Sequence, residues 1–301
     1  MSTVPYFPRP LATVAPRDLL LAERLGLKRT DVVLEIGTGS GSSLFRLAPA
    51  VAAYHGVDIA RQPVERLRRE VQRQGLENVD FFVRDFCRPG AAETLPCQYD
   101  VVFSCDTLEH VEQPGPFLEN VHAAIKPGGR LLLTYPNEHP RRAHGITFFE
   151  RRSELLELLV AAGFAEDQVQ IDELQMTRRS NGLLSLGWEL PRKLSKKAVE
   201  LVIGPTSASE APQTFDETHF FALADRFERW APLINAYCWA VLKAMDMAGP
   251  VYRSSPASET IWDQRILIQA TRCETATVGC SSPTEPAAAV GRFDTAEPVR
   301  A

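Results

Sequence analysis

The sequence predicts an α/β fold built on a mostly parallel sheet, and three observations support this. An apolar run at residues 33–36 leads directly into closely spaced glycines, Gly37, Gly39 and Gly41. Short apolar runs then alternate with segments of helical periodicity, as strands alternate with crossover helices in such folds. Acidic residues also stand at the ends of three successive runs. Together these features predict a ligand site at one edge of the sheet.

The glycine turn favours a nucleotide-like ligand. A strand that breaks into glycines and then into a helix brings backbone N–H groups against such a ligand. The dinucleotide fingerprint G-x-G-x-x-G needs a glycine where this chain has Ser42, because Gly41 comes one place early. The spacing therefore disfavours a dinucleotide, although a dinucleotide-binding oxidoreductase stays open as an alternative. The same turn also has a purely structural interpretation, in which the glycines serve only close packing and no ligand binds.

Two further acids end the next two apolar runs. Residues 52–59 form the second run, in which Asp58 lies 17 residues after Gly41. A carboxylate at this place can accept hydrogen bonds from both ribose hydroxyls of a nucleotide. Residues 79–85 form the third run, which ends in Asp85. With the acid before the glycine turn, these residues form a pattern that chance alone rarely produces.

The remaining segments continue the alternation. Gly75 is placed to stop the helix that joins the second and third strands. The sequence predicts helices at residues 17–25 and 61–75, and later strands at 99–105, 126–137 and 168–176.

The chain resembles class I S-adenosylmethionine-dependent methyltransferases. The resemblance rests on E-x-G-x-G-x-G at residues 35–41, LEHV at 108–111 and KPGG at 126–129, followed by the H-x-x-x-F of His144 and the AAGF at 161–164. These motifs are similar to those of the methyltransferases of ubiquinone and menaquinone biosynthesis and their relatives in secondary metabolism. The likeness covers roughly residues 30–175. It implies a Rossmann-like, seven-stranded, mostly parallel sheet with strand seven antiparallel.

The resemblance also implies the cofactor and its site. S-adenosylmethionine is the expected methyl donor and S-adenosylhomocysteine the product. Glu35 is expected to help hold the amino end of the cofactor, Asp58 its ribose and Asp85 its adenine amino group, with Phe86 packed on the adenine ring. The residues expected to bind the cofactor are Glu35, Gly37, Thr38, Gly39, Gly41, Asp58, Ile59, Asp85, Phe86 and Cys105.

A methyl acceptor that is a hydroxyl or an activated carbon must lose a proton, so a base is expected near the cofactor. The candidates are His110 and Glu109 after the fourth strand and His144 after the fifth. His110 also has a structural interpretation, as a capping and packing element at the start of a helix. The resemblance allows a divalent ion on Glu109, His110 and a third group, but the sequence shows no complete ligand set and no metal ligand is assigned.

The chain after the sixth strand departs from the family pattern. Residues 264–272 are the best candidate for the seventh strand, so a helical insertion at 178–262 is expected to form a substrate cap or an interface. Helices are expected at 194–203, 216–230 and 233–248, the last apolar nearly all round, as a buried helix, a dimer interface or a wall of a pocket for an apolar substrate. The predicted units are an N-terminal arm and helix at 1–30, a cofactor-binding core at 31–177, the insertion at 178–262, a final strand at 263–272 and a disordered tail at 273–301.

Composition narrows the function further. A net charge of −5 with interspersed signs argues against nucleic acid as a partner. The six cysteines form no C-x-x-C pair, so free thiols and a cytoplasmic location are expected. Stable membrane insertion is not expected. The sequence thus predicts a methyltransferase for a small, hydrophobic metabolite, with O-methylation favoured over C- or N-methylation and a homodimer possible through the insertion. A non-catalytic cofactor-binding module is the remaining alternative.

Overall fold

The computed structural model describes residues 16–39, 41–139, 145–191 and 231–274. Its helices are α1 (Arg17–Arg24), α2 (Leu44–Leu47), α3 (Arg61–Gln74), α4 (Pro114–Ala124), α5 (Arg152–Ala161), α6 (Arg178–Leu184) and α9 (Ala231–Met247). Its strands are β1 (Val32–Ile36), β2 (Ala53–Asp58), β3 (Val79–Val83), β4 (Tyr99–Cys105), β5 (Ile125–Asn137), β6 (Val169–Met176), β7 (Tyr252–Pro256) and β8 (Gln264–Thr271). Single turns of 3-10 helix lie at Ala48–Ala50, Ala92–Thr94, Leu108–His110 and Glu166–Gln168, and a π-helical turn lies at Ser185–Glu189.

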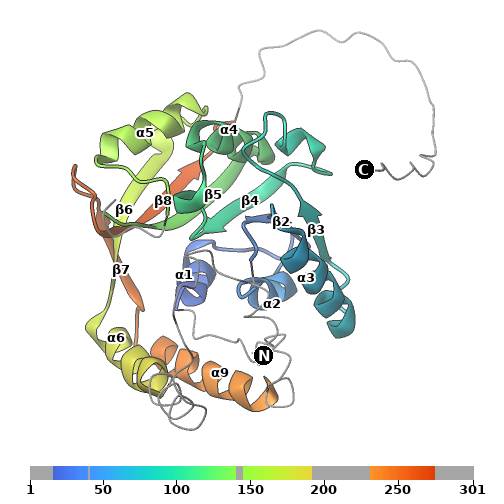
Figure 1. The fold of residues 1–301 in the computed structure, drawn as a ribbon, viewed down its shortest axis with the longest axis vertical. Coiled ribbons are helices and arrows are strands. Elements are labelled where there is room, and N and C mark those ends of the chain that lie inside the picture. Colours follow the sequence, from blue (N-terminus) through green and yellow to red (C-terminus); the bar gives the residue numbers. More distant parts are fainter. Residues whose placement is uncertain (1–15, 40, 140–144, 192–230, 275–301) are drawn as a thin grey trace, which may run out of the picture.

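The strands form one sheet in the order β3-β2-β1-β4-β5-β8-β6-β7 (Figure 1). Strands β1 to β5 are parallel where they pair, whereas β8 runs antiparallel to both β5 and β6. The predicted α/β class and the antiparallel final strand are therefore confirmed. Because β8 is reversed, its first residues lie beside the last residues of β5, with Arg265 opposite Pro136.

Both faces of the sheet are buried, which explains the nearly continuous apolar runs of the central strands. In β4, Val102 packs with the cluster that includes α4 and α5, while Val101 and Phe103 pack with the cluster that includes α1, α2 and α3. The side chains of a strand alternate between its faces, so each strand contributes to both cores. Gly75 ends α3 in the left-handed conformation at φ 66°, as expected from the sequence.

The sheet has eight described strands rather than the predicted seven. The additional strand, β7, pairs antiparallel with β6 and lies inside the segment that the sequence analysis expected to be helical. Its sequence, YRSSP, shows no apolar alternation, and Tyr252 is its one large apolar side chain. Its position at the sheet edge tolerates Pro256, which has no N–H to donate. Strand β7 thus forms because β6 offers a free edge, a cause that the hydrophobic pattern does not show.

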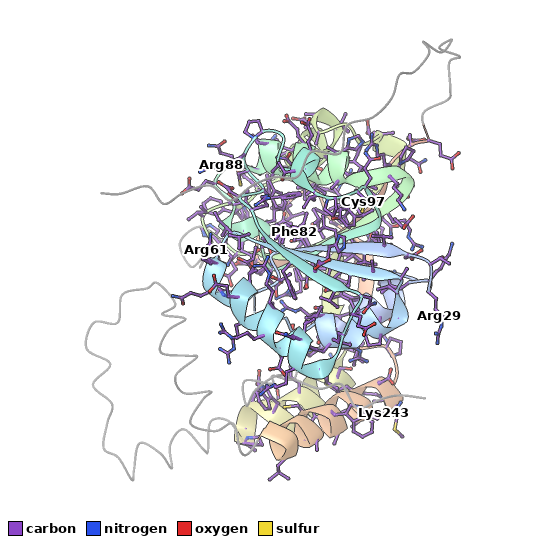
Figure 2. The ribbon with its side chains drawn as sticks, turned by 90° about the vertical axis from the view of Figure 1, so that its right-hand side faces the viewer. Arg29, Arg61, Phe82, Arg88, Cys97 and Lys243 are labelled. Carbon is purple, nitrogen blue, oxygen red and sulfur yellow. The ribbon has the colours of Figure 1, made fainter. Side chains whose placement is uncertain are left out.

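Helices α6 and α9 pack against each other at one end of the molecule, away from α4 and α5 (Figures 1 and 2). The expected helix at 233–248 is confirmed as α9. Its buried side chains Cys238, Leu242 and Met245 form a small cluster with Leu19 of α1 and Val251. Among the described helices, none is both long and apolar enough to cross a membrane. The helices expected at 194–203 and 216–230 lie outside the described residues, as do the N-terminal arm before residue 16 and the tail from residue 275.

Strand β8 holds the two parts of the sheet together, so a cavity there should be costly. Ile268 is fully buried between β5 and β6. We expect Ile268→Ala to lower the free energy of unfolding by about 2–5 kcal/mol through lost burial and an unfilled cavity. Urea denaturation followed by circular dichroism measures this. Gln269→Ala on the same strand is the control, and an equal loss in the control would contradict the burial argument.

Candidate functional site

The glycine turn after β1 follows a path that ordinary residues rarely take. Gly37, Gly39 and Gly41 have φ values of 79°, 46° and 75°, all in the left-handed region. The Gly37 N–H donates to the carbonyl of Val57 at 2.7 Å, which ties the turn to the end of β2. A side chain at Gly37 would also collide with that of Thr107. The turn therefore needs glycine for its conformation and, at Gly37, for its close approach to the Thr107 side chain.

Asp58 fixes the turn from the end of β2. Its Oδ2 accepts from the Gly39 N–H at 2.9 Å, and its Oδ1 accepts from the Ala60 N–H at the same distance. Each carboxylate oxygen has more than one lone-pair site, so both oxygens can accept further hydrogen bonds. The carboxylate at the second strand end thus lies in contact with the glycine turn.

A cleft of about 530 Å³ opens at the carboxyl ends of the parallel strands. Phe86 contributes to its wall and packs edge-on against Phe117, with ring centroids 6.3 Å apart. Asp85 turns the chain after β3, because its Oδ1 accepts from the Cys87 N–H at 3.0 Å. The predicted residues that line the cleft are Gly37, Gly39, Asp58, Ile59, Asp85, Phe86 and His110.

Four of the predicted cofactor residues do not line this cleft. Gly41 lies beyond it, and Glu35, Thr38 and Cys105 are buried. Glu35 accepts a hydrogen bond from the Tyr54 hydroxyl at 2.6 Å, and burial raises its pKa to about 8. Burial also raises the pKa of the Cys105 thiol to about 12. The side chains of Glu35, Thr38 and Cys105 are thus buried apart from the residues that line the cleft.

Glu109 and His110 lie on the 3-10 turn after β4. The His110 side chain is 59% exposed and borders both the main cleft and a smaller cavity of about 50 Å³ beside Glu109 and Phe148. Its Nε2 lies 3.9 Å from Glu109 Oε1, close enough for an ion pair but too far for a hydrogen bond. Burial raises the pKa of Glu109 to about 7. The third candidate base, His144, lies outside the described residues.

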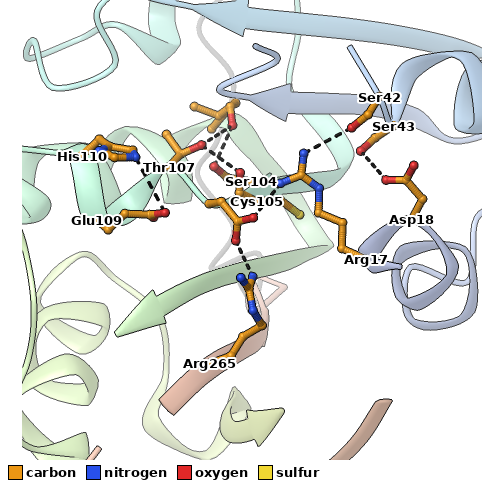
Figure 3. Close-up of polar contacts among 12 residues, drawn as sticks. Arg17, Asp18, Ser42, Ser43, Ser104, Cys105, Thr107, Glu109, His110 and Arg265 are labelled. Carbon is orange, nitrogen blue, oxygen red and sulfur yellow. Dashed lines mark hydrogen bonds and ion pairs between the residues drawn. The ribbon is translucent and has the colours of Figure 1, made fainter. Parts of the chain in front are cut away.

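An ion-pair cluster that the sequence analysis missed stands beside these residues (Figure 3). Arg17 Nη1 donates to Asp106 Oδ2 at 2.7 Å, and Arg265 Nη1 donates to Asp106 Oδ1 at 2.5 Å. Asp106 has a φ of 53°, unusual for a residue other than glycine, and also lines the cleft. The antiparallel direction expected for the last strand was the available signal, because it brings Arg265 to the ligand edge.

No three His, Cys, Asp or Glu side chains come together as a metal site in the described part of the chain. Asp106, an acid that lines the same cleft as His110, has both oxygens engaged by arginines. The third metal ligand that the sequence analysis left open is thus not found among these residues. Within the described residues, Cys87, Cys97, Cys105, Cys238 and Cys273 form no disulfide.

The sequence of the site matches a known family model. Residues 34–131, which run from β1 into β5 and include the glycine turn, match the methyltransferase domain. This part of the chain is similar to methyltransferase domains. The match includes Asp58, Asp85 and the turn of Glu109 and His110.

The chain is also similar to ubiquinone biosynthesis O-methyltransferases. Over 134 residues it is 32% identical to the enzyme of Pseudomonas paraeruginosa and 28% identical to that of Acinetobacter baumannii. Each match takes in 44% of this chain and 56% of the relative, so the chain spans about half the length of these curated relatives. A structure of phosphoethanolamine N-methyltransferase 2 from Haemonchus contortus shares the fold, with a TM-score of 0.50 at 18% identity over 85% of this chain and 52% of that one.

Glu35 should make stability depend on pH. Its pKa of about 8 in the folded chain exceeds the ordinary 4.5, so folded Glu35 keeps a proton that the unfolded chain releases. Its contribution therefore makes the free energy of unfolding fall as pH rises between these values. We expect Glu35→Gln to flatten this fall, measured by urea denaturation from pH 5 to 8.

The control for this measurement is Glu157→Gln on the exposed side of α5, which should keep the wild-type slope. Burial also raises the pKa of Asp18 and Glu109, so part of the slope should persist in Glu35→Gln. An unchanged slope in Glu35→Gln would show that Glu35 is ionised in the folded chain.

Proposed function

We propose that the protein is an S-adenosylmethionine-dependent methyltransferase that acts on a small metabolite. The observation that carries the proposal is that one cleft joins the glycine turn, Asp58, Asp85 and Phe86 to His110. A cofactor region and a candidate proton acceptor therefore share one opening. The ubiquinone biosynthesis O-methyltransferases named above support methylation as the reaction, and O-methylation as its form.

The residues of the cleft fit S-adenosylmethionine. A volume of about 530 Å³ lies within the usual range of roughly 300–1,000 Å³ for ligand sites. Asp58 would hold the ribose, Asp85 the adenine amino group, and Phe86 the adenine ring. The N–H groups of the glycine turn would lie against the methionine part. The Haemonchus contortus neighbour was solved with S-adenosylhomocysteine, which agrees with this assignment.

The cofactor, when bound, supplies an electrophilic methyl group on a sulfonium. The protein's part is to hold the acceptor in line and to take its proton. Positioning alone can contribute about 7–11 kcal/mol in favourable intramolecular cases. His110 is the proposed proton acceptor, because it borders both the cleft and the adjoining small cavity. Glu109 would stabilise the protonated imidazole from 3.9 Å.

Two other functions have less support. A dinucleotide-dependent oxidoreductase conflicts with the glycine spacing, since Ser42 stands where the fingerprint needs glycine. A non-catalytic binding module would tolerate loss of the cofactor residues, yet the glycine turn, Asp58 and Asp85 are intact. The cap role of the insertion, a homodimer through it, a hydrophobic acceptor and a cytoplasmic location stay predictions from the sequence.

The cofactor assignment predicts the ligand that the protein binds. Isothermal titration calorimetry should detect binding of S-adenosylhomocysteine and no binding of NADH. Asp58→Asn should weaken S-adenosylhomocysteine binding about 10- to 100-fold, because hydrogen bonds to a charged group contribute about 1.5–3 kcal/mol. Asp80→Asn, an exposed acid on β3, is the control and should bind as the wild type does. Tighter binding of NADH would replace the methyltransferase proposal with the oxidoreductase.

The proposed base predicts a separation of turnover from binding. His110→Ala should lower kcat by about 100-fold or more, as expected for loss of general base catalysis. The affinity for S-adenosylhomocysteine should change little, because the ribose and adenine contacts are made elsewhere in the cleft. Release of S-adenosylhomocysteine with a panel of phenols and catechols measures turnover. Unchanged turnover in His110→Ala would remove His110 from the mechanism.

A further inference from the structure

The cluster of Arg17, Asp106 and Arg265 lies where the methyl acceptor is expected. Asp106 is the first residue after β4 and lines the cleft, while Arg265 stands beside the carboxyl end of β5. Ligands of open α/β sheets bind at this edge. The charges of both arginines also act on Glu109, which borders the small cavity. The arginines therefore lie close to the proposed proton-transfer residues.

The cluster of Arg17, Asp106 and Arg265 contains one more positive charge than negative charge. Two guanidinium groups share the single carboxylate of Asp106. Burial raises the pKa of Glu35 to about 8, that of Glu109 to about 7 and that of Asp18 above its usual range, so these nearby acids carry less than their full negative charge at neutral pH. A partly buried charge without a full counter-charge is costly unless a ligand supplies one. The positive charge that remains suits an anion.

Both arginines keep hydrogen-bond donors for such an anion. A guanidinium has five N–H donors, and within the described residues Arg265 donates only through Nη1 to Asp106. Arg17 uses Nη1 on Asp106 and Nη2 on Ser42, while its buried Nε has no partner in the described part of the chain. Their side chains are 30% and 33% exposed, so a ligand can reach them. A planar guanidinium edge matches a carboxylate with two parallel hydrogen bonds.

We propose that Arg17 and Arg265 bind a carboxylate carried by the methyl acceptor, with Asp106 holding the two guanidinium groups in place. The inference rests on the proposed function and adds the chemical class of its substrate. The acceptor then has an anionic end at the arginines and its nucleophile near His110. Tyr252 of β7 lies within the field of both arginines and borders the same region.

The test compares benzoate with benzamide, which have the same flat ring but differ in charge. Each is titrated calorimetrically into the wild-type protein saturated with S-adenosylhomocysteine. Benzoate should bind about 10-fold more tightly than benzamide, as expected for a charge-assisted bidentate contact. Arg265→Gln should abolish this preference. Arg265→Lys should keep only part of it, because lysine retains the charge without the planar edge.

Arg253→Gln is the matched control, since Arg253 is an exposed arginine on β7. It should keep the full preference for benzoate. Circular dichroism and S-adenosylhomocysteine affinity establish that each variant is folded. If Arg265→Gln does not fold, Arg265→Lys is used in its place. Wild-type protein that binds neither probe, or both equally, overturns the proposal, as does a preference that survives in Arg265→Gln.

The two proposals fail in different ways. If S-adenosylhomocysteine does not bind, the cofactor assignment is wrong. The benzoate and benzamide titrations on the ligand-free protein then still test the arginine site. If S-adenosylhomocysteine binds and benzoate shows no advantage, the methyltransferase proposal stands and the two arginines only join α1 to β8 through Asp106.

Discussion

The carboxylate of Asp58 is the contact on which the geometry of the candidate site depends. One oxygen holds the glycine turn through Gly39, and the other holds the start of α3 through Ala60. The carbonyl of Val57, one residue earlier, accepts from Gly37 and Thr38. The end of β2 therefore fixes the turn that follows β1. Loss of this connection would leave three left-handed glycines without a fixed path.

Parallel register explains why the sequence could predict this half of the site. Ile36 lies beside Val57 and Asp58 beside Val83, so the ends of β1, β2 and β3 meet along one edge. A glycine turn and two acids that each follow a strand must then converge. Their spacing along the chain is sufficient information, because short crossover connections leave little freedom in how the strands align.

The sequence analysis was less successful where the outcome depends on side-chain direction or on distant contacts. The resemblance implied Cys105 as a cofactor residue, whereas in the structure the Cys105 side chain packs in the same buried cluster as Phe103, two residues earlier. The sequence analysis missed Asp106 as the meeting point of Arg17 and Arg265, which lie 89 and 159 residues away along the chain. No local pattern records such a meeting. It arises only after the sheet and α1 have assembled.

The reversed direction of β8 sets the segment between β6 and β8 apart from the strands that carry the glycine turn. The chain leaves the sheet at the end of β6, returns as β7 beside β6 and then enters β8; the end of β6 and the start of β8 lie at the same edge as the ends of the parallel strands. Strands β1, β2 and β3 stand on the other side of β4 and pair with no strand of the described residues between β6 and β8. The segment between β6 and β8 can therefore be exchanged or lengthened during evolution while the strands that carry the glycine turn stay unchanged. A designer can graft a new segment at the same two points.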